Sequence, residues 1–109
     1  MIDDLAEPPA DEFDLARVLA ALADPHRLVM VRYVAAHGES WCSRVIQDTG
    51  LEMSKSTFSH HLRMLRLAGV VTKRHEGTKG YVSLRAGDLD HRFPGLIGAV
   101  LSAEFEPAA

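Results

Sequence analysis

SKSTFSHHLRMLRLAG, at residues 54–69, is the segment with the clearest residue pattern in the chain. Its apolar residues Phe58, Leu62 and Leu65 recur at intervals of four and three, so they share one face of a helix. A serine at the start of the segment is a good helix N-cap, and a glycine at its end commonly follows a last helical turn. The pattern therefore predicts an amphipathic helix over residues 55–68.

The polar face of this helix carries hydroxyl, imidazole and guanidinium groups, which can all reach base edges in the major groove of DNA. Arg63 can bind guanine with two hydrogen bonds or hold a phosphate, and Lys55 can anchor the DNA backbone. Ser56 and Thr57 lie near the free backbone N–H groups of the first turn, which favour phosphate. The alternative interpretation is an ordinary solvated helix side. The residues expected to contact the major groove are Lys55, Ser56, Thr57, Ser59, His60 and Arg63.

A shorter helix is predicted directly before this segment, over residues 41–49. Ser40 is expected to cap its start and Gly50 to end it. Residues 51–53 then form a short turn that leads into the helix over 55–68. Two helices joined by a short turn with glycine are the helix-turn-helix arrangement, in which the second helix enters the major groove.

The residue pattern changes after Gly69, where strand-forming residues replace the helical period. Residues 70–72 and 81–83 are rich in β-branched or aromatic side chains, which favour strands. The basic segment 73–80 between them contains glycine and is expected to form the tip of a hairpin. Such a tip can lie along the DNA backbone or in the minor groove as a wing. The wing residues expected to contact DNA are Lys73, Arg74 and Lys79.

Three further helices are predicted from apolar periodicity, over residues 11–22, 25–36 and 88–105. Residues 1–10 hold acidic residues and two prolines without an apolar period, so we expect a flexible acidic tail there. Residues 11–106 are expected to form one domain, mostly α-helical with a small β-hairpin (α+β). The predicted order is α-α-α-α-β-β-α, the order of a winged helix-turn-helix domain.

The first and last of these helices carry more apolar surface than a small three-helix core requires. We therefore expect them to pair across a two-fold axis and form a homodimer. The alternative is that they only complete the core of the single chain. The residues expected in the dimer interface are Phe13, Val18, Leu19, Phe93, Leu96, Ile97, Val100 and Leu101.

The charge of the chain is distributed unevenly. The net charge is −3, but residues 54–85 hold seven basic residues and one acidic residue, so that segment is +6 and the remainder sums to −9. A basic stretch of this kind is often only a solvated surface. Because it coincides here with the helix-turn-helix and the wing, it favours contact with phosphates.

Several classes of protein are disfavoured by the sequence. No apolar run reaches the length of a membrane span, and acidic residues stand near the N-terminus where a secretory signal would be basic, so we expect a cytoplasmic protein that does not cross a membrane. No glycine-rich phosphate loop, nucleophile elbow or HExxH motif is present, so we expect no enzyme. Ser59 and His60 are adjacent on a helix and point apart, so they do not form a catalytic pair.

Three segments of the chain resemble the ArsR/SmtB family of repressors. Residues 20–28, AALADPHRL, are similar to an ALADPTRL motif of that family. Residues 54–65, SKSTFSHHLRML, resemble its recognition helix SQSTVSHHLKVL, and residues 68–84 resemble its wing, AGLV followed by R.EG and Y.L. The resemblance covers roughly residues 15–85 in register. A turn two residues longer than usual, at residues 51–53, is its main departure.

The resemblance implies a homodimer that binds an imperfect palindrome in duplex DNA. Two recognition helices would enter successive major grooves about 34 Å apart. The bound dimer would repress transcription by occluding a promoter, and a signal would release it by favouring another arrangement of the dimer. The alternative is a winged-helix protein-interaction module with little DNA affinity of its own.

Members of that family that bind metals use two kinds of site, and this chain matches neither completely. One site uses a pair of cysteines on the first helix of the helix-turn-helix, where this chain has only Cys42, which is interpreted as a small packed residue. The other site lies across the last helices of a dimer, where Asp90 and Leu101 replace histidines of the family. No metal and no other cofactor are therefore expected. The remaining metal candidates are Asp88, Asp90, His91 and Glu104, although Asp88 or Asp90 is more simply a helix cap.

The other histidines give weaker signals. His61 lies between the two faces of its helix and is expected to be packed or hydrogen-bonded, whereas His26 and His37 flank the second helix and are expected to be solvated. The signal that releases DNA is not identified by any of them. A metal, a small molecule, thiol chemistry and a partner protein all remain open as the effector.

Overall fold

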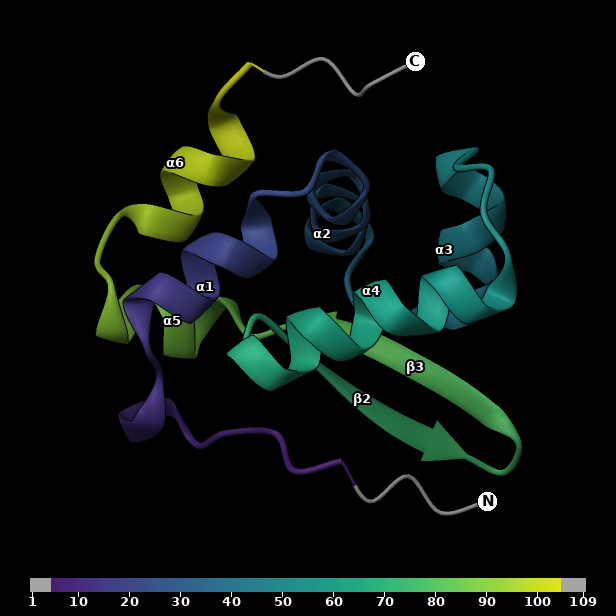
Figure 1. Cartoon of the computed structure of the whole chain (residues 1–109), viewed down its shortest axis with the longest axis horizontal. Helices are drawn as coiled ribbons and strands as arrows, with labels where there is room; N and C mark the ends of the chain where they lie inside the picture. Colours follow the sequence, from purple (N-terminus) through teal and green to yellow (C-terminus); the bar gives the residue numbers. More distant parts are fainter. Residues whose placement is uncertain (1–4, 105–109) are drawn as a thin grey trace.

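The computed structural model of the chain describes residues 5–104. Within this range the chain forms a short 3-10 helix, six α-helices and one three-stranded antiparallel sheet in the order β1-β3-β2 (Figure 1). The elements are the 3-10 helix Ala10–Glu12, α1 Leu15–Leu22, α2 Pro25–His37, β1 Ser40–Trp41, α3 Cys42–Thr49, α4 Lys55–Ala68, β2 Val71–Glu76, β3 Lys79–Leu84, α5 Ala86–Arg92 and α6 Leu96–Ser102.

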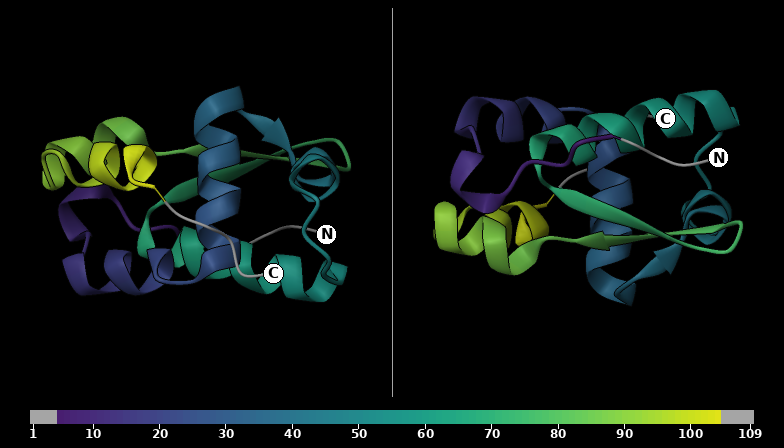
Figure 2. Two further views of the ribbon diagram at one scale, coloured as in Figure 1. Left: turned by 90° about the horizontal axis from the view of Figure 1, so that it is seen from above. Right: turned by 90° about the horizontal axis from the view of Figure 1, so that it is seen from below.

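The helices occupy two ends of the molecule, with α2 between them. Helices α1, α5 and α6 gather at one end, and α3, the start of α4 and the hairpin turn lie at the other (Figure 1). Views from above and below show α2 crossing the β2–β3 hairpin at a steep angle, with α4 running beside the hairpin (Figure 2). The predicted order of four helices and a hairpin is confirmed up to the last strand.

The core forms where α1, α2 and α4 meet the sheet. Phe58, Leu62 and Leu65 are all buried, which confirms the predicted apolar face of α4. Val18 of α1 and Val45 of α3 are almost completely buried against the same cluster. Because the inner face of α4 is fixed in this way, its outer face has a defined orientation toward solvent.

Side-chain caps set the start of three helices, α1, α2 and α4. Asp24 Oδ1 accepts hydrogen bonds from the backbone N–H groups of His26 at 2.8 Å and Arg27 at 3.1 Å, which starts α2. Ser54 Oγ accepts a hydrogen bond from the backbone N–H of Thr57 at 3.1 Å, which starts α4 as predicted. These bonds satisfy backbone donors that have no partner inside the helix.

The predicted starts of two helices are wrong. Helix α1 begins at Leu15, after Asp14 caps it, and Asp11 lies in the separate 3-10 helix. Ser40 does not cap α3, because Ser40 and Trp41 pair with β3 as a short strand and Trp41 occupies the N-cap position. The extended backbone that the sheet requires moves the start of α3 to residue 42.

The predicted single helix over residues 88–105 is also wrong. It is divided into α5 and α6 around Pro94, whose ring lacks the N–H needed in a helix interior, and Gly95, which has a φ of +84°. Neither predicted aspartate cap is found: Asp88 pairs with Arg85, and Asp90 Oδ1 accepts a hydrogen bond from the N–H of Gly95. Residues 105 and 106, where the predicted helix and domain end, lie outside the described residues.

The predicted flexible tail is bound to the domain from residue 5 onward; residues 1–4 lie outside the described part of the chain. Glu7 accepts hydrogen bonds from the Thr72 hydroxyl at 2.6 Å and from the backbone N–H of Lys73 at 3.0 Å. The carbonyl of Pro8 accepts a hydrogen bond from Arg85. The hydrogen bonds of Glu7 therefore hold this part of the segment against the start of β2.

The hairpin is longer than predicted, and only residues 77 and 78 lie in its turn. Lys73 and Arg74 face Val82 and Tyr81 in the strand register, so they are strand residues and not part of a loop. No helix among the described residues is both long enough and apolar enough to cross a lipid bilayer.

Candidate nucleic-acid interface

The outer face of α4 is open to solvent. All six residues predicted to contact the major groove lie on this helix and are exposed. Ser56, Ser59 and Arg63 follow one another at helical spacing, so they form one strip opposite the buried residues. The strip offers hydroxyl groups and a guanidinium without a competing apolar surface. The exposed residues are Lys55, Ser56, Thr57, Ser59, His60 and Arg63.

A hollow of about 210 Å³ separates α4 from the hairpin. Its basic lining comes from both sides, with Arg63 and Arg66 on α4 and Lys73 on β2. Ser59 adds a hydroxyl, and Leu5 of the N-terminal segment closes one edge. The structure thus brings two predicted helix residues, Ser59 and Arg63, and one predicted wing residue, Lys73, to the same groove.

Arg66 is neutralised inside this groove. Its Nε lies 2.7 Å from Glu7 Oε2, and its side chain is only 8% exposed. Burial raises the pKa of the Glu7 carboxyl, but hydrogen bonds from Thr72 and Arg66 outweigh this effect and lower the pKa overall. Glu7 is therefore charged at neutral pH and removes one cation from the surface available to phosphate. Local residue patterns do not predict this pair, because Glu7 and Arg66 are far apart in the chain.

Arg74, a predicted wing residue, is held by two acids, Glu76 on β2 and Glu39 just before β1. Its guanidinium makes two hydrogen bonds to Glu39, at 2.7 and 2.8 Å, and one to Glu76 at 2.9 Å. It also lies 4.5 Å from the centre of the Tyr81 ring. The hydrogen bonds from Arg74 lower the pKa of Glu39, so both groups are charged.

Lys79 lies against an exposed aromatic side chain. Its ammonium is 3.8 Å from the centre of the Trp41 ring, which in turn packs edge-on against Tyr81. Trp41 belongs to β1 and is 41% exposed. The sequence predicts Trp41 as the first residue of the helix over residues 41–49, but Trp41 belongs to β1, whose pairing with β3 directs it to the hairpin surface.

A hydrogen-bonded cluster links α4 to the two helices behind it. Arg27 Nη1 lies 3.1 Å from His61 Nδ1, and Arg27 Nε donates to the carbonyl of Ala21 at 2.6 Å. Burial and Arg27 lower the pKa of His61, whereas Asp24 raises it, and the net shift is downward. His61 is therefore packed and hydrogen-bonded, as predicted. His26 was expected to be solvated, but its ring packs edge-on against His61.

The two metal-site patterns of the sequence stay incomplete in the single chain. Burial raises the pKa of the Cys42 thiol, so it is protonated at neutral pH, in agreement with a packed residue. Asp88 and Asp90 are engaged by Arg85 and Gly95. Among the described residues, the one group of three close potential ligands is instead Asp24, His26 and His61.

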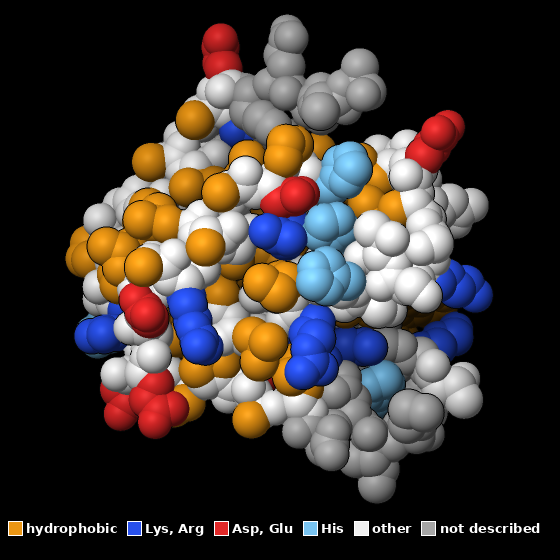
Figure 3. Space-filling model, viewed as in Figure 1, with side chains coloured by type: hydrophobic (Ala, Val, Ile, Leu, Met, Phe, Trp, Pro, Cys, Tyr) orange, Lys and Arg blue, Asp and Glu red, His pale blue; other side chains and the backbone are white. Residues whose placement is uncertain are grey.

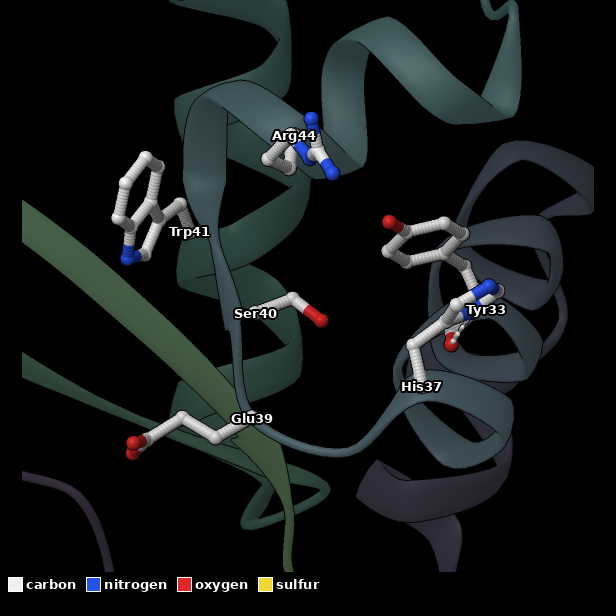
Figure 4. A pocket seen from close by; sticks show the side chains of 6 residues that line it. All are labelled: Tyr33, His37, Glu39, Ser40, Trp41 and Arg44. Atoms are coloured by element: carbon white, nitrogen blue, oxygen red, sulfur yellow. Dashed lines mark hydrogen bonds between the residues drawn. The ribbon is translucent and has the colours of Figure 1, made fainter.

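A second hollow, of about 420 Å³, lies between the end of α2 and the start of α3. Its side chains do not converge on a common point: Tyr33 and His37 stack on one side, whereas Trp41 and Glu39 point away on the other (Figure 4). The polar groups are already used, because Tyr33 donates to Asp48 and Glu39 binds Arg74. This hollow therefore has few free groups to orient a ligand.

The residues predicted for a dimer interface divide into two groups. Phe13, Val18 and Ile97 are buried in the core of the single chain, so the expectation that they face a partner is corrected. Leu19 is 46% exposed on α1. The half-buried residues at the edge of the core are Phe93, Leu96, Val100 and Leu101.

Comparisons with known proteins agree with this geometry. The helix-turn-helix domain family matches residues 22–74. The uncharacterized HTH-type transcriptional regulator YceK of Bacillus subtilis is 32% identical over 89 residues, which are 81% of this chain and 87% of that protein. A cadmium resistance transcriptional regulatory protein CadC homolog of Staphylococcus aureus is 37% identical over 71 residues, 65% of this chain and 57% of that protein.

A solved structure shows the same fold. It is the solution structure of a homodimeric winged helix-turn-helix DNA-binding domain from Mycobacterium bovis, described as a possible ArsR-family transcriptional regulator. It is 32% identical to this chain, with a TM-score of 0.63, and the match covers 87% of this chain and 84% of the other.

The fold and the open face of α4 define a winged helix-turn-helix domain, a class of DNA-binding transcriptional regulators. Within this class, the chain belongs to the ArsR/SmtB family. The predicted family and fold are thereby confirmed.

Proposed function

We propose that this chain binds duplex DNA as a homodimer and represses transcription from an imperfect palindrome. The observation that carries the proposal is the exposed strip of α4, with Ser59 and Arg63 facing a groove whose other side is Lys73. In this arrangement α4 enters the major groove and the hairpin follows the backbone. Lys79 is the wing cation nearest the turn.

The surface offered to a second copy lies on the end of the molecule formed by α1 and α6. Leu15 and Leu19 are each 46% exposed, and hydrophobic side chains gather on this part of the surface (Figure 3). A hollow of about 360 Å³ runs between Leu19, Leu28 and Val100. An apolar surface of this kind supports pairing across a two-fold axis, and the related domain from Mycobacterium bovis is described as homodimeric.

Repression follows if the bound dimer occludes a promoter, and release follows if an effector binds one arrangement of the dimer more tightly than the other. A metal, a small molecule or a partner protein are the open effector classes. The proposal places the protein in the cytoplasm and gives it no catalytic role.

The test is fluorescence anisotropy of the full chain on the duplex upstream of its own gene, against a scrambled duplex, at several salt concentrations. Selective binding with a steep loss of affinity as salt rises is expected, because phosphate contacts release counterions. The same affinity for both duplexes, or no binding at any salt concentration, would overturn the proposal.

The variant Lys79→Ala tests whether the hairpin contacts the DNA backbone. It is expected to weaken binding to both duplexes equally and to flatten the salt dependence by about one phosphate contact. Arg92→Gln, on α5 at the other end of the molecule, removes one positive charge outside the proposed interface and is the matched control. Equal losses for both variants would mean that only the overall charge matters.

The paired cations favour one alternative, a winged-helix protein-interaction module. Arg66 and Arg74 are neutralised by Glu7 and Glu39, which reduces the basic surface. That module predicts no salt-dependent DNA binding and no effect of Arg63→Ala on affinity for DNA. The anisotropy experiment therefore separates the two functions directly.

A further inference from the structure

Asp24, His26 and His61 form a compact cluster behind the open face of α4. Each offers one ligand atom, and these atoms lie within 4.8 Å of one another. The aspartate is the N-cap of α2, His26 follows in its first turn, and His61 comes from α4. A row of histidine side chains, beside acidic and basic ones, is visible on this face of the molecule (Figure 3).

The donor set suits a borderline divalent metal ion. Two imidazoles and one carboxylate, with a water in the fourth position, are typical of tetrahedral zinc sites that keep an open position. Ligand atoms in such a site stand roughly 3.3 Å apart, given zinc–ligand distances near 2.0 Å. Atoms within 4.8 Å of one another can reach that spacing by small side-chain rotations. A carboxylate has two oxygens, so Asp24 can keep its capping bond with one and bind a metal with the other.

Arg27 competes with a metal for His61. Its Nη1 lies 3.1 Å from His61 Nδ1, and because arginine has only donors, this nitrogen must be the acceptor of the neutral ring. The proton is then on Nε2, so no lone pair there is free for a metal. A metal on Nδ1 replaces Arg27 directly, and a metal on Nε2 moves the proton to Nδ1, where it opposes the guanidinium. Either way, metal binding breaks the contact between Arg27 and His61.

We propose that Asp24, His26 and His61 bind a zinc-like divalent cation, and that this cation displaces Arg27 from His61. The displaced guanidinium keeps its hydrogen bond to the carbonyl of Ala21, at the end of α1. Metal binding thus replaces the hydrogen bond between His61 and Arg27 by coordination of His61 with Asp24 and His26, and it breaks the connection from α4 through Arg27 to the end of α1. This site is distinct from Cys42 and from the last helix, and it goes beyond DNA binding.

The first test is direct titration of the untagged full chain with Co²⁺ and with Zn²⁺ in competition with a chromogenic chelator. One ion per chain and visible d–d bands of tetrahedral Co²⁺ are expected. His26→Ala, His61→Gln and Asp24→Asn should each weaken the affinity by more than about tenfold. Asp24→Asn is the most informative, because asparagine still caps the helix but loses the charged ligand.

Arg27→Met tests the competition. Removing the competing donor should tighten metal binding by about tenfold. Arg17→Met, which removes an exposed positive charge on α1, is the matched control for charge alone and should change the affinity far less. Equal changes for Arg27→Met and Arg17→Met would overturn the displacement of Arg27.

Control variants and spectroscopy keep the result independent of folding. His37→Ala removes an exposed histidine outside the cluster and should leave metal binding unchanged. Nitrogen-15 NMR of the histidine rings of the intact protein should show His26 and His61 shifting with Zn²⁺. No saturable binding, an octahedral Co²⁺ spectrum, or binding that survives both His26→Ala and His61→Gln would overturn the site. No DNA is present in these experiments, so their failure leaves the proposed function untouched.

Discussion

Helix α4 and the β2–β3 hairpin are both basic in sequence, but their cations have different surroundings. On α4, Arg63 is exposed and has no ion-pair partner among the described residues. On the hairpin, Arg74 is bound by two carboxylates and Lys79 rests on Trp41. A count of basic residues therefore overestimates the charge that the hairpin offers to DNA.

Because of this difference, we expect α4 to contact bases and the hairpin to contact the DNA backbone. A side chain that reads a base must be free to reorient, because its hydrogen bonds are made only in the complex. A wing that follows the backbone needs only a local positive field, and a guanidinium that is already paired can hold the hairpin in shape.

Gly69→Ala should destabilise α4 and the hairpin together, since Gly69 joins α4 to β2. Its φ is +87°, and an added Cβ would lie 2.3 Å from Cε1 of Phe13. A loss of about 3 kcal/mol or more in the free energy of unfolding is expected, from strain and overpacking. Chemical denaturation measures it.

Gly50→Ala is the matched control for Gly69→Ala. Its φ is +68°, but no described atom lies within 4 Å of an added Cβ, so only the backbone cost of about 1–2 kcal/mol is expected. Equal losses for the two variants would show that the Phe13 ring moves aside at no cost, so that its contact with residue 69 does not add to the destabilisation.

Arg63→Ala should weaken binding to the specific duplex by about 1–3 kcal/mol and relax the preference for one base pair. Stability should change by less than about 0.5 kcal/mol, because the side chain is exposed. Anisotropy on duplexes with single substitutions measures the first effect and thermal unfolding the second. A uniform loss on all duplexes would assign Arg63 to a phosphate, and no loss would remove α4 from the interface.

Glu7→Gln should destabilise the protein by about 1–2 kcal/mol at neutral pH, since it weakens the bonds to Arg66 and Thr72. The folded pKa of Glu7 is lowered. Its charge therefore contributes stability above the unfolded pKa, about 4.3, and this contribution is lost as pH falls through the folded pKa. Denaturation curves of both proteins should converge at acid pH. A gap that does not depend on pH would contradict this, and Glu12→Gln, an exposed acid, is the control.

Glu39→Gln should have the smallest effect. It removes one acid that Arg74 now neutralises, so the hairpin gains net positive charge. DNA affinity should rise a few-fold at low salt, and the salt dependence should steepen by about one phosphate contact. Unchanged affinity would show that Arg74 stays away from DNA even when it is released.

Sequence reasoning predicted α4 most accurately, because its caps and its inner and outer faces are all local features. It failed where distant segments decide local structure. Ser40 is a good cap by type, yet pairing with Val82 makes it a strand residue. The apolar period predicts one helix across Pro94, but this residue lies between the end of α5 and the start of α6.

The DNA-contacting site was also predicted only where local features decide it. Exposure of Ser59 and Arg63 follows from helical spacing, whereas the partners of Arg66 and Arg74 come from Glu7 and Glu39, far away in the chain. The cluster of Asp24, His26 and His61 was missed because it joins two helices. One usable signal was the position of His61 near the apolar face of α4, where a buried imidazole needs a partner.

The two-residue strand β1 has a mechanical consequence. Ser40 and Trp41 pair with Val82 and Tyr81, and α3 begins at the next residue. The hairpin and the first helix of the helix-turn-helix are thus joined through shared backbone hydrogen bonds, and the hairpin cannot swing without pulling on α3. To fit a duplex with an altered groove width, the helix-turn-helix and the hairpin would have to rotate together, because the hairpin cannot bend alone.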